Sequence, residues 1–428
     1  MKNFLIIWMG ELISSIGGGM TAFALTIYAL KVTNSVSAVS LITFLAFLPT
    51  VLLSPLGGLL ADHYDRRLLM IIGDSFSALG LVYILWQLKL GASDLSPIYF
   101  GVIISAVFSS LVEPAYRATV SDLLTEKEYG KASGMVQLAS NARYLISPAL
   151  AGFLLAYFDI RVILWIDIIS FLVAAFMISF VKRAMNNLPS KSKIATKDTT
   201  TFKAVLSFLK KQRGIQALIA IMTIVCFFIG LVQILIEPLI LNIADTQTVG
   251  TMETLCTFGL LAGSLWIGIK GIKSKHASIL TYSGLCGGLF ICLSGFTMHL
   301  WWIGLMIFFF FMTLAFINTC ADVLIRVSTP RHLQGRMWGI ISFVTQFGTI
   351  IAYICSGYLA DKVFEPLMAK EGALAHSVGI VIGVGAGRGI GLMLILSGLG
   401  LMITFLAIGH NHSIKQIHVH KEESVVSD

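Results

Sequence analysis

The chain has 428 residues, of which 57% are hydrophobic and only 12% are charged, and its formal net charge is +8. A soluble globular domain usually carries about 25% charged residues, whereas the mean hydropathy of this chain is +0.88. These values exclude an ordinary water-soluble domain and predict a protein that lies largely within a membrane.

Twelve stretches of the chain are long and apolar enough to cross a hydrocarbon core about 30 Å thick, which takes about 20 residues. Because lipid offers the backbone no hydrogen-bond partners, we expect these stretches to be helices rather than strands. The predicted spans are residues 4–30, 36–60, 68–90, 97–116, 132–157, 162–181, 215–241, 248–269, 277–297, 301–325, 337–360 and 388–409. The sequence therefore predicts an all-α membrane protein with twelve transmembrane helices.

The distribution of basic residues predicts how the spans are oriented. With the N-terminus in the cytoplasm, 23 Lys and Arg fall on the cytoplasmic side and six on the outer side, as the positive-inside rule requires. The positive net charge therefore reflects topology and indicates no nucleic-acid partner. We expect a multi-pass protein of the cell membrane, surrounded by the lipid bilayer, with both termini in the cytoplasm.

One long polar connector, residues 182–214, divides the spans six and six. We expect an N-terminal bundle (1–181), a cytoplasmic linker (182–214), a C-terminal bundle (215–409) and a cytoplasmic tail (410–428). Shifting the chain by 205 residues aligns short runs of the two halves, such as Gly130-Lys131 with Gly335-Arg336. Two such repeats predict two pseudo-symmetric six-helix bundles, with a solute pathway between them near the bilayer midplane.

The loop between the second and third predicted spans concentrates charges in the run "GLLADHYDRR", residues 58–67. Gly57 and Gly58 are expected to let helices approach closely, and Arg66 and Arg67 to lie at the membrane surface. The acidic residues of the loop oppose the positive-inside pattern, so they need partners such as the positive N-terminal end of another helix. Ordinary charged turn residues are the alternative.

This run resembles the G-x-x-x-D-R-x-G-R-R motif between spans 2 and 3 of the major facilitator superfamily. Gly58, Asp62, Arg66 and Arg67 match the motif, whereas His63 and Asp65 replace its first Arg and second Gly and are assigned no family role. Residues 144–152, "YLISPALAG", are similar to the span 5 antiporter motif of the same family. With "LQGRMWG" (333–339), these runs are similar to the macrolide-efflux and enterobactin-exporter branch.

The resemblance implies a twelve-helix rocker-switch transporter. It assigns to Asp62 the capping of a helix across the interface between the halves, with Arg66 and Arg67 in the accompanying charge network. The expected recipient is the start of the predicted span 11, around Met337. The resemblance also implies that Pro148 and Gly152 shape span 5 at that interface.

Ionisable residues inside the spans are candidates for function, because each costs about 2.5–3.5 kcal/mol at a span centre. Arg143 lies 11 residues into span 5, about 16 Å deep at 1.5 Å of rise per residue. We expect it to face the central cavity and to pair with a carboxylate, a carbonyl cluster or an anionic substrate group. A buried structural bridge is the alternative.

Glu11 lies about 10 Å into span 1 by the same rise. A carboxylate held away from water favours its neutral form, so it could exchange a proton in a proton-coupled carrier; a carboxylate bonded within the bundle is the alternative. Glu237, before Pro238, and Asp322 lie closer to the outer and inner faces and are weaker candidates. We expect Asp74 and Asp167 to be helix-end carboxylates.

Two further pairs of polar residues are candidates. Glu113 and Arg117 have the i,i+4 spacing of a helical ion pair, and they either join the Arg66 and Arg67 network or form a plain helix-end bridge. Asn141 and Gln346 correspond under the 205-residue shift and lie near mid-membrane. They either bind substrate or bond between helices.

The leading hypothesis is a secondary exporter of an amphipathic small molecule, a drug or a siderophore, coupled to entry of a proton or another cation. A uniporter or importer on the same fold is the first rival. The second rival is a permease subunit of an ATP-driven complex. The chain has no P-loop of its own, so a separate partner would have to supply the ATPase. An intramembrane enzyme is disfavoured because the histidines lie in loops or at span ends. We expect a monomer with no cofactor and no metal site, and we interpret "GVGAGRGIG" (383–391) as close helix packing.

Overall fold

The computed structural model describes residues 2–91, 94–124, 129–185, 209, 212–272, 276–329 and 334–410. These ranges are mostly helical and contain no strand. Eleven helical segments within them are long and apolar enough to cross a membrane. The all-α membrane fold predicted from composition is confirmed.

The helices follow the predicted spans closely in their order along the chain. In the first half they are α1 (Lys2–Thr33), α2 (Val36–His63), α3 (Arg66–Lys89), α4 (Ser96–Ser109), α5 (Val112–Leu123), α6 (Tyr129–Leu145), α7 (Ser147–Tyr157) and α8 (Ile160–Met185). In the second half they are α10 (Arg213–Leu241), α11 (Thr246–Lys270), α12 (His276–Ser294), α13 (Leu300–Ser328), α14 (Gln334–Leu359), the π-helix η3 (Ala360–Phe364), α15 (Glu365–Met368), α16 (Val378–Ile382) and α17 (Arg388–His410).

The chain forms two compact units, each with its own helical packing. The first unit comprises Met1–Lys193 together with Ala244–Thr254, and the second comprises Ile194–Ile243 and Leu255–Asp428. The first residues of α11 thus belong to the first unit. Most of the predicted linker and residues 411–428 of the tail lie outside the described residues, so the predicted boundaries stay a prediction.

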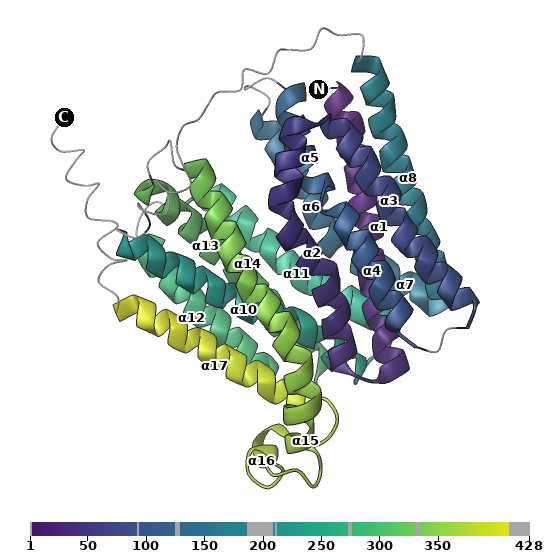
Figure 1. Cartoon of the computed structure of the whole chain (residues 1–428). Helices are drawn as coiled ribbons and strands as arrows, with labels where there is room; N and C mark the ends of the chain where they lie inside the picture. Colours follow the sequence, from purple (N-terminus) through teal and green to yellow (C-terminus); the bar gives the residue numbers. More distant parts are fainter. Residues whose placement is uncertain are drawn as a thin grey trace, which may run out of the picture. The chain divides into compact units, whose positions relative to one another are not determined.

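Within the first unit, α1 packs along α8, and α3 packs between α4 and α8 (Figure 1). Glycines permit these close approaches. A methyl group at Gly10 of α1 would lie 3.2 Å from the Cα atom of Ala174 on α8. At the contact of α3 with α4, Gly80 and Gly101 face each other's backbones. Lipid provides little hydrophobic driving force between helices, so their association depends on close packing of their surfaces. Small residues allow the backbones to come this close.

Within the second unit, α12 packs against both α13 and α17, and α10 packs along α14. Gly284 of α12 leaves room for the ring of Phe405 on α17, and Gly348 of α14 lies against the Thr223 carbonyl of α10. The short helices α15 and α16 lie beyond the ends of α14 and α17 (Figure 1). These two helices were not predicted from the sequence.

Two predicted spans are interrupted by proline rather than continuous. Span 5 breaks at Ile146 between α6 and α7, and span 4 breaks between α4 and α5. Proline has no N–H, and its ring would clash with the carbonyl of residue i−4 in a straight helix. Pro148 and Pro114 therefore end the regular helix just before them. Span 5 is not among the eleven long helical segments found in the described residues, whereas span 4 is counted as Ser96–Val120.

The close contact of α1 with α8 allows a matched test. A methyl group at Gly17 would lie 2.7 Å from Oδ1 of Asp167, whereas the adjacent Gly18 has no neighbouring atom within 4 Å of that position. We expect Gly17→Ala to lower the thermal unfolding temperature in detergent and Gly18→Ala to leave it unchanged or raise it, since alanine favours helix. Equal unfolding temperatures for the two variants would contradict this packing.

Candidate functional site

Two carboxylates are buried inside the first unit. Asp74 on α3 is 2% exposed, and Asp167 on α8 is 1% exposed. The expectation that both are helix-end carboxylates is therefore wrong. Each lies about two turns inside its helix, and α3 and α8 pack directly against each other, so neighbouring helices cover both side chains.

A third carboxylate, Glu11 on α1, belongs to the same group. Glu11 is half-buried and lies within electrostatic range of Asp74 and of Glu113. Asp74 is also within electrostatic range of Asp167. We call Glu11, Asp74 and Asp167 the acidic cluster. Three helices thus bring like charges together inside one bundle, although the residues are far apart in the sequence.

Arg143 on α6 is a cation that interacts with this cluster. Its side chain is exposed in the structure and lies within electrostatic range of Asp167. Asp167 also accepts a hydrogen bond from the Ser170 hydroxyl at 3.2 Å. A carboxylate was one of the partners expected for Arg143 from the sequence, but Asp167 was not identified as that carboxylate.

Two glycines on α1 fix the position of this site. Gly17 lies directly against Asp167 and Ser170, and Gly19 lies against Ser147 and the carbonyl of Arg143. The Ser147 hydroxyl donates a hydrogen bond to the Ile16 carbonyl at 2.9 Å. α1 therefore approaches both α8 and the break between α6 and α7. The run "GGG" at 17–19 is the sequence signal for this contact, although no such contact was predicted from it.

Arg66 of the charged loop links three elements of the first unit. Its Nε atom donates to the Ala61 carbonyl at 3.1 Å, and its Nη1 atom donates to the Ala118 carbonyl of α5 at 2.9 Å. The guanidinium thus joins the end of α2 to α5 at the start of α3. Asp62 lies in the last turn of α2, and its side chain is outside the described residues. Its expected capping role stays a prediction.

Asp65, which replaces a glycine of the family motif, has a definite structural role. It caps α3 by accepting hydrogen bonds from the backbone N–H groups of Arg67, at 3.0 Å, and Leu68, at 3.4 Å. Its other oxygen lies 3.5 Å from Nζ of Lys182 on α8. The residue therefore stabilises a helix start and links α3 to α8.

The α5 pair Glu113 and Arg117, and the glycines before the charged loop, make simpler contacts. Glu113 and Arg117 form an i,i+4 ion pair at 2.8 Å, with side chains 69% and 62% exposed. This geometry favours the plain helix-end bridge, and exposed pairs of this kind contribute little to stability. Gly57 lies close to the Ser110 carbonyl, whereas a methyl group added at Gly58 would have no neighbour within 4 Å. The expected close approach therefore belongs to Gly57 alone.

The span 5 motif packs against the first turns of α11, within the first unit. A methyl group at Gly152 would lie 2.9 Å from the Thr246 carbonyl, and the Pro148 carbonyl lies directly against Gly250. The backbone N–H of Ala149 donates to the Thr254 hydroxyl at 3.2 Å. The glycine and the proline thus position α7 against α11.

α11 begins with a side-chain cap. The Asp245 carboxylate accepts a hydrogen bond from the backbone N–H of Thr248 at 3.0 Å. The hydrogen bond from the Thr248 side chain, followed by that from its backbone, holds the pKa of Asp245 below its usual range. An ionised carboxylate at a helix N-terminus also interacts favourably with the helix dipole.

The second unit contains a cavity of about 510 Å³ between α10, α13 and α14, with one carboxylate in its lining. Asp322 is that carboxylate, so the structure places this candidate at a cavity wall. The cavity is lined by Met222, Asn318, Thr319, Ala321, Asp322, Ile325, Ile341, Ser342 and Thr345. Polar groups from α13 and α14 thus share this space with apolar side chains from all three helices.

The remaining intramembrane candidates lie outside these two sites. Glu237 is buried on α10 at 9% exposure. Asn141 on α6 and Gln346 on α14 are half-buried, and Gln346 does not line the 510 Å³ cavity. The structure therefore brings Glu11 and Arg143 to one site and Asp322 to another.

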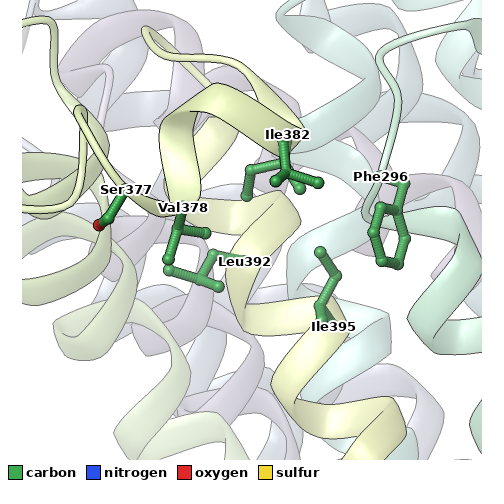
Figure 2. A pocket seen from close by; sticks show the side chains of 7 residues that line it. Phe296, Ser377, Val378, Ile382, Leu392 and Ile395 are labelled. Carbon is green, nitrogen blue, oxygen red and sulfur yellow. The ribbon is translucent and has the colours of Figure 1, made fainter.

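A second pocket of the second unit, about 440 Å³, lies beneath α16 and is almost wholly apolar (Figure 2). Phe296, Val378, Ile382, Leu392 and Ile395 surround it, and Ser377 at its edge is a polar residue of the lining. Such a lining offers few groups for orienting a polar ligand.

The glycine run 383–391 is a loop and a helix start rather than a packed helix. Gly383, Gly385 and Gly387 have positive φ values, and α17 begins only at residue 388. The expected helix packing is therefore wrong for this part, although Gly391 does lie against Gly295. The Glu365 carboxylate accepts hydrogen bonds from the N–H groups of Gly387, at 3.2 Å, and Ile390, at 3.1 Å.

The chain is similar in sequence to a family of known proteins. Residues 7–353 match the family model described as Major Facilitator Superfamily. The chain is 28% identical to the uncharacterized MFS-type transporter YfiS of Bacillus subtilis (strain 168), over 85% of this chain and 88% of that protein. It is 22% identical to macrolide efflux protein A of Streptococcus pyogenes, over 84% and 90% of the two chains.

Among solved structures, the chain resembles a bacterial homolog of the human lysosomal transporter Spinster in an inward-facing, unoccupied conformation. The TM-score is 0.74 with 11% sequence identity, over 97% of this chain and 98% of that chain. At this identity the likeness concerns the fold alone.

The capping role of Asp65 can be separated from its ion pair. Asp65→Ala should destabilise the protein by about 1 kcal/mol, as expected for loss of an N-cap. Asp65→Ser keeps a capping oxygen but loses the contact with Lys182, so it should unfold at a temperature between those of Asp65→Ala and wild type. The measurement is thermal unfolding in detergent. An Asp65→Ala protein as stable as wild type would rule out the cap.

Proposed function

Because the chain belongs to the major facilitator superfamily, we propose that it is a secondary active exporter in which proton entry drives an amphipathic small molecule out of the cell. Members of this family are transporters rather than enzymes. A drug such as a macrolide, or a siderophore, is the proposed class of substrate. A relative named macrolide efflux protein A is similar over 84% of this chain, and this similarity supports export of a macrolide-like drug.

The acidic cluster is the observation that carries the proposal of proton coupling. Two carboxylates less than 3% exposed and a half-buried third lie within one bundle, and Arg143 interacts with Asp167 among them. Buried groups of like charge avoid simultaneous ionisation by binding protons. A bundle that holds such groups can therefore take up and release a proton as its exposure to water changes.

The cavity of the second unit supports an amphipathic substrate. Met222, Ile325 and Ile341 offer apolar surface, while Asp322 and the hydroxyl and amide side chains of α13 and α14 offer hydrogen bonds. Small-molecule sites usually combine a mainly apolar lining with a few polar groups that orient the ligand. We propose that these residues contribute to substrate binding. We also propose that the protein acts as a monomer.

The proposed direction of transport refers to the cell membrane with both termini in the cytoplasm. The excess of Lys and Arg in the connections assigned to the cytoplasm supports this orientation. Labelling of single cysteines introduced at residues 2 and 94 would test it, because these positions are expected on opposite sides.

Transport in proteoliposomes tests coupling and substrate class together. With a labelled macrolide on one side and an imposed pH gradient, we expect uphill accumulation that stops when a protonophore collapses the gradient. A uniporter would only equilibrate the macrolide, whatever the gradient. Accumulation driven by a sodium gradient alone would contradict proton coupling. Absence of any macrolide transport would exclude the macrolide as a substrate.

Filling the second-unit cavity should impair binding of bulky substrates. Ser342 lines the cavity on α14, so Ser342→Leu should raise the KM for a macrolide with a smaller change in maximal rate. The matched control is Ser264→Leu on α11, where the exposed hydroxyl bonds only its own helix, to the Leu260 carbonyl at 2.8 Å. Equal KM values for the two variants would exclude the cavity as a substrate site.

A further inference from the structure

Asp74 is the carboxylate of the acidic cluster with the least favourable surroundings for a charge. Its side chain is 2% exposed, and its Oδ2 atom is buried with no hydrogen-bond partner among the described residues. Its electrostatic neighbours are Glu11 and Asp167, both acidic. A buried carboxylate oxygen without a donor is strongly disfavoured in its ionised form.

Among the described residues, the charged groups that act on Asp74 are both acidic. Glu11 faces Asp74 from α1 and Asp167 faces it from α8. On α5, the buried Tyr116 is within electrostatic range of Glu11, and its hydroxyl has no hydrogen-bond partner in the described part of the chain. The ion pair of Glu113 with Arg117 on the same helix is exposed.

Two further helices, α4 and α2, pack against α3. On α4, Tyr99 is the ionisable residue and lies in the first turn of that helix, whereas Ser105 and Ser109 bond to Ser77 of α3, at 3.1 and 2.9 Å. On α2, His63 lies in the last turn, and its ring is within 2.9 Å of the Leu59 carbonyl. The two serines thus bond across to α3, whereas His63 bonds within its own helix.

The positive charge of Arg143 acts on Asp167 rather than on Asp74. Arg143 interacts with Asp167, which also accepts a hydrogen bond from Ser170. Opposite charge and a hydrogen-bond donor both favour the ionised form of a carboxylate. Asp167 and Arg143 can therefore balance each other, which leaves Asp74 and Glu11 as the groups that share a proton.

We propose that Asp74 is the proton-carrying residue of this transporter, and this inference rests on the proposed proton-coupled export. A proton from the outer water forms an O–H bond at the Asp74 carboxyl, and the same proton is released to the cytoplasm when that carboxyl becomes ionised. On uptake, an O–H bond of a hydronium ion in the outer water breaks as the bond at Asp74 forms. On release, the Asp74 O–H bond breaks and the proton binds a water molecule on the cytoplasmic side. Glu11 is the more exposed neighbour on α1. Its own ionisation affects whether Asp74 binds or releases the proton, because ionising two close carboxylates together is energetically unfavourable.

Asp74→Asn tests the proposal, because asparagine keeps the size and polarity of the side chain and cannot carry the proton. In proteoliposomes we expect this variant to lose macrolide accumulation driven by a pH gradient, down to the level of protein-free liposomes. Its exchange of macrolide for macrolide at equal pH should persist. Asp94→Asn, at an exposed loop carboxylate that bonds Ser96, is the matched control and should behave as wild type.

Infrared spectroscopy of the purified protein provides a readout that needs no substrate. The wild type should show the carbonyl band of a protonated carboxylic acid at neutral pH. In the difference spectrum against wild type, Asp74→Asn should show a loss of intensity in this band, and Asp94→Asn should show none. If Asp74→Asn does not fold, Asp74→Glu replaces it, and coupled transport should then persist with a shifted pH profile.

The possible failures are distinguishable. If wild-type transport ignores the pH gradient, the proposed function fails, and the infrared band still decides whether Asp74 holds a proton. If Asp74→Asn accumulates macrolide as wild type does, or keeps the carboxylic acid band at full wild-type intensity, the assignment of Asp74 is overturned. Loss of the band in Glu11→Gln but not in Asp74→Asn would assign the proton to Glu11 instead.

Discussion

In the membrane-spanning helices of this protein, a backbone or side-chain polar group without a partner inside the protein is energetically costly, because lipid offers none. The helices satisfy the backbone, and many hydroxyls are satisfied within their own helix: Thr26, Thr43 and Ser179, for example, donate to carbonyls three or four residues earlier. The same constraint explains the glycines at helix contacts. Helices that gain little from apolar burial in lipid need close contact of their surfaces, and glycine provides it at Gly10, Gly17 and Gly348.

Charged residues occur in two different environments in this protein. At the helix ends they bond to backbone groups or to each other, as Arg66 does with two carbonyls and Asp65 does with the start of α3 and with Lys182. In the interior of the first unit, three carboxylates are brought near one another instead, and Arg143 interacts with one of them. A charge imbalance of this kind costs stability, and its persistence inside a bundle is typical of functional sites.

The sequence predicted the helical spans well and their irregularities poorly. Apolar composition alone located the twelve spans, but the breaks at Ile146 and near Ser110 depend on prolines whose effect the length criterion ignores. The candidate site was predicted in part. Depth along a span identified Glu11 and Arg143, and it assigned Asp74 and Asp167 to helix ends because both lie about two turns from a predicted boundary. Their burial depends on the helix that covers them, which span length does not reveal.

By itself, the sequence determined the number and order of the spans, the family motif at residues 58–67 and the absence of a P-loop, because each depends on residues close together in the chain. Only the tertiary structure decided that Glu11, Asp74 and Asp167 share one bundle interior, that Asp65 caps α3, and that Asp322 lines a cavity. The physical reason lies in the solvent. In water, the polar face of a helix marks its exposed side, whereas in lipid the outer and buried faces are both apolar, so the sequence carries little information about which faces meet.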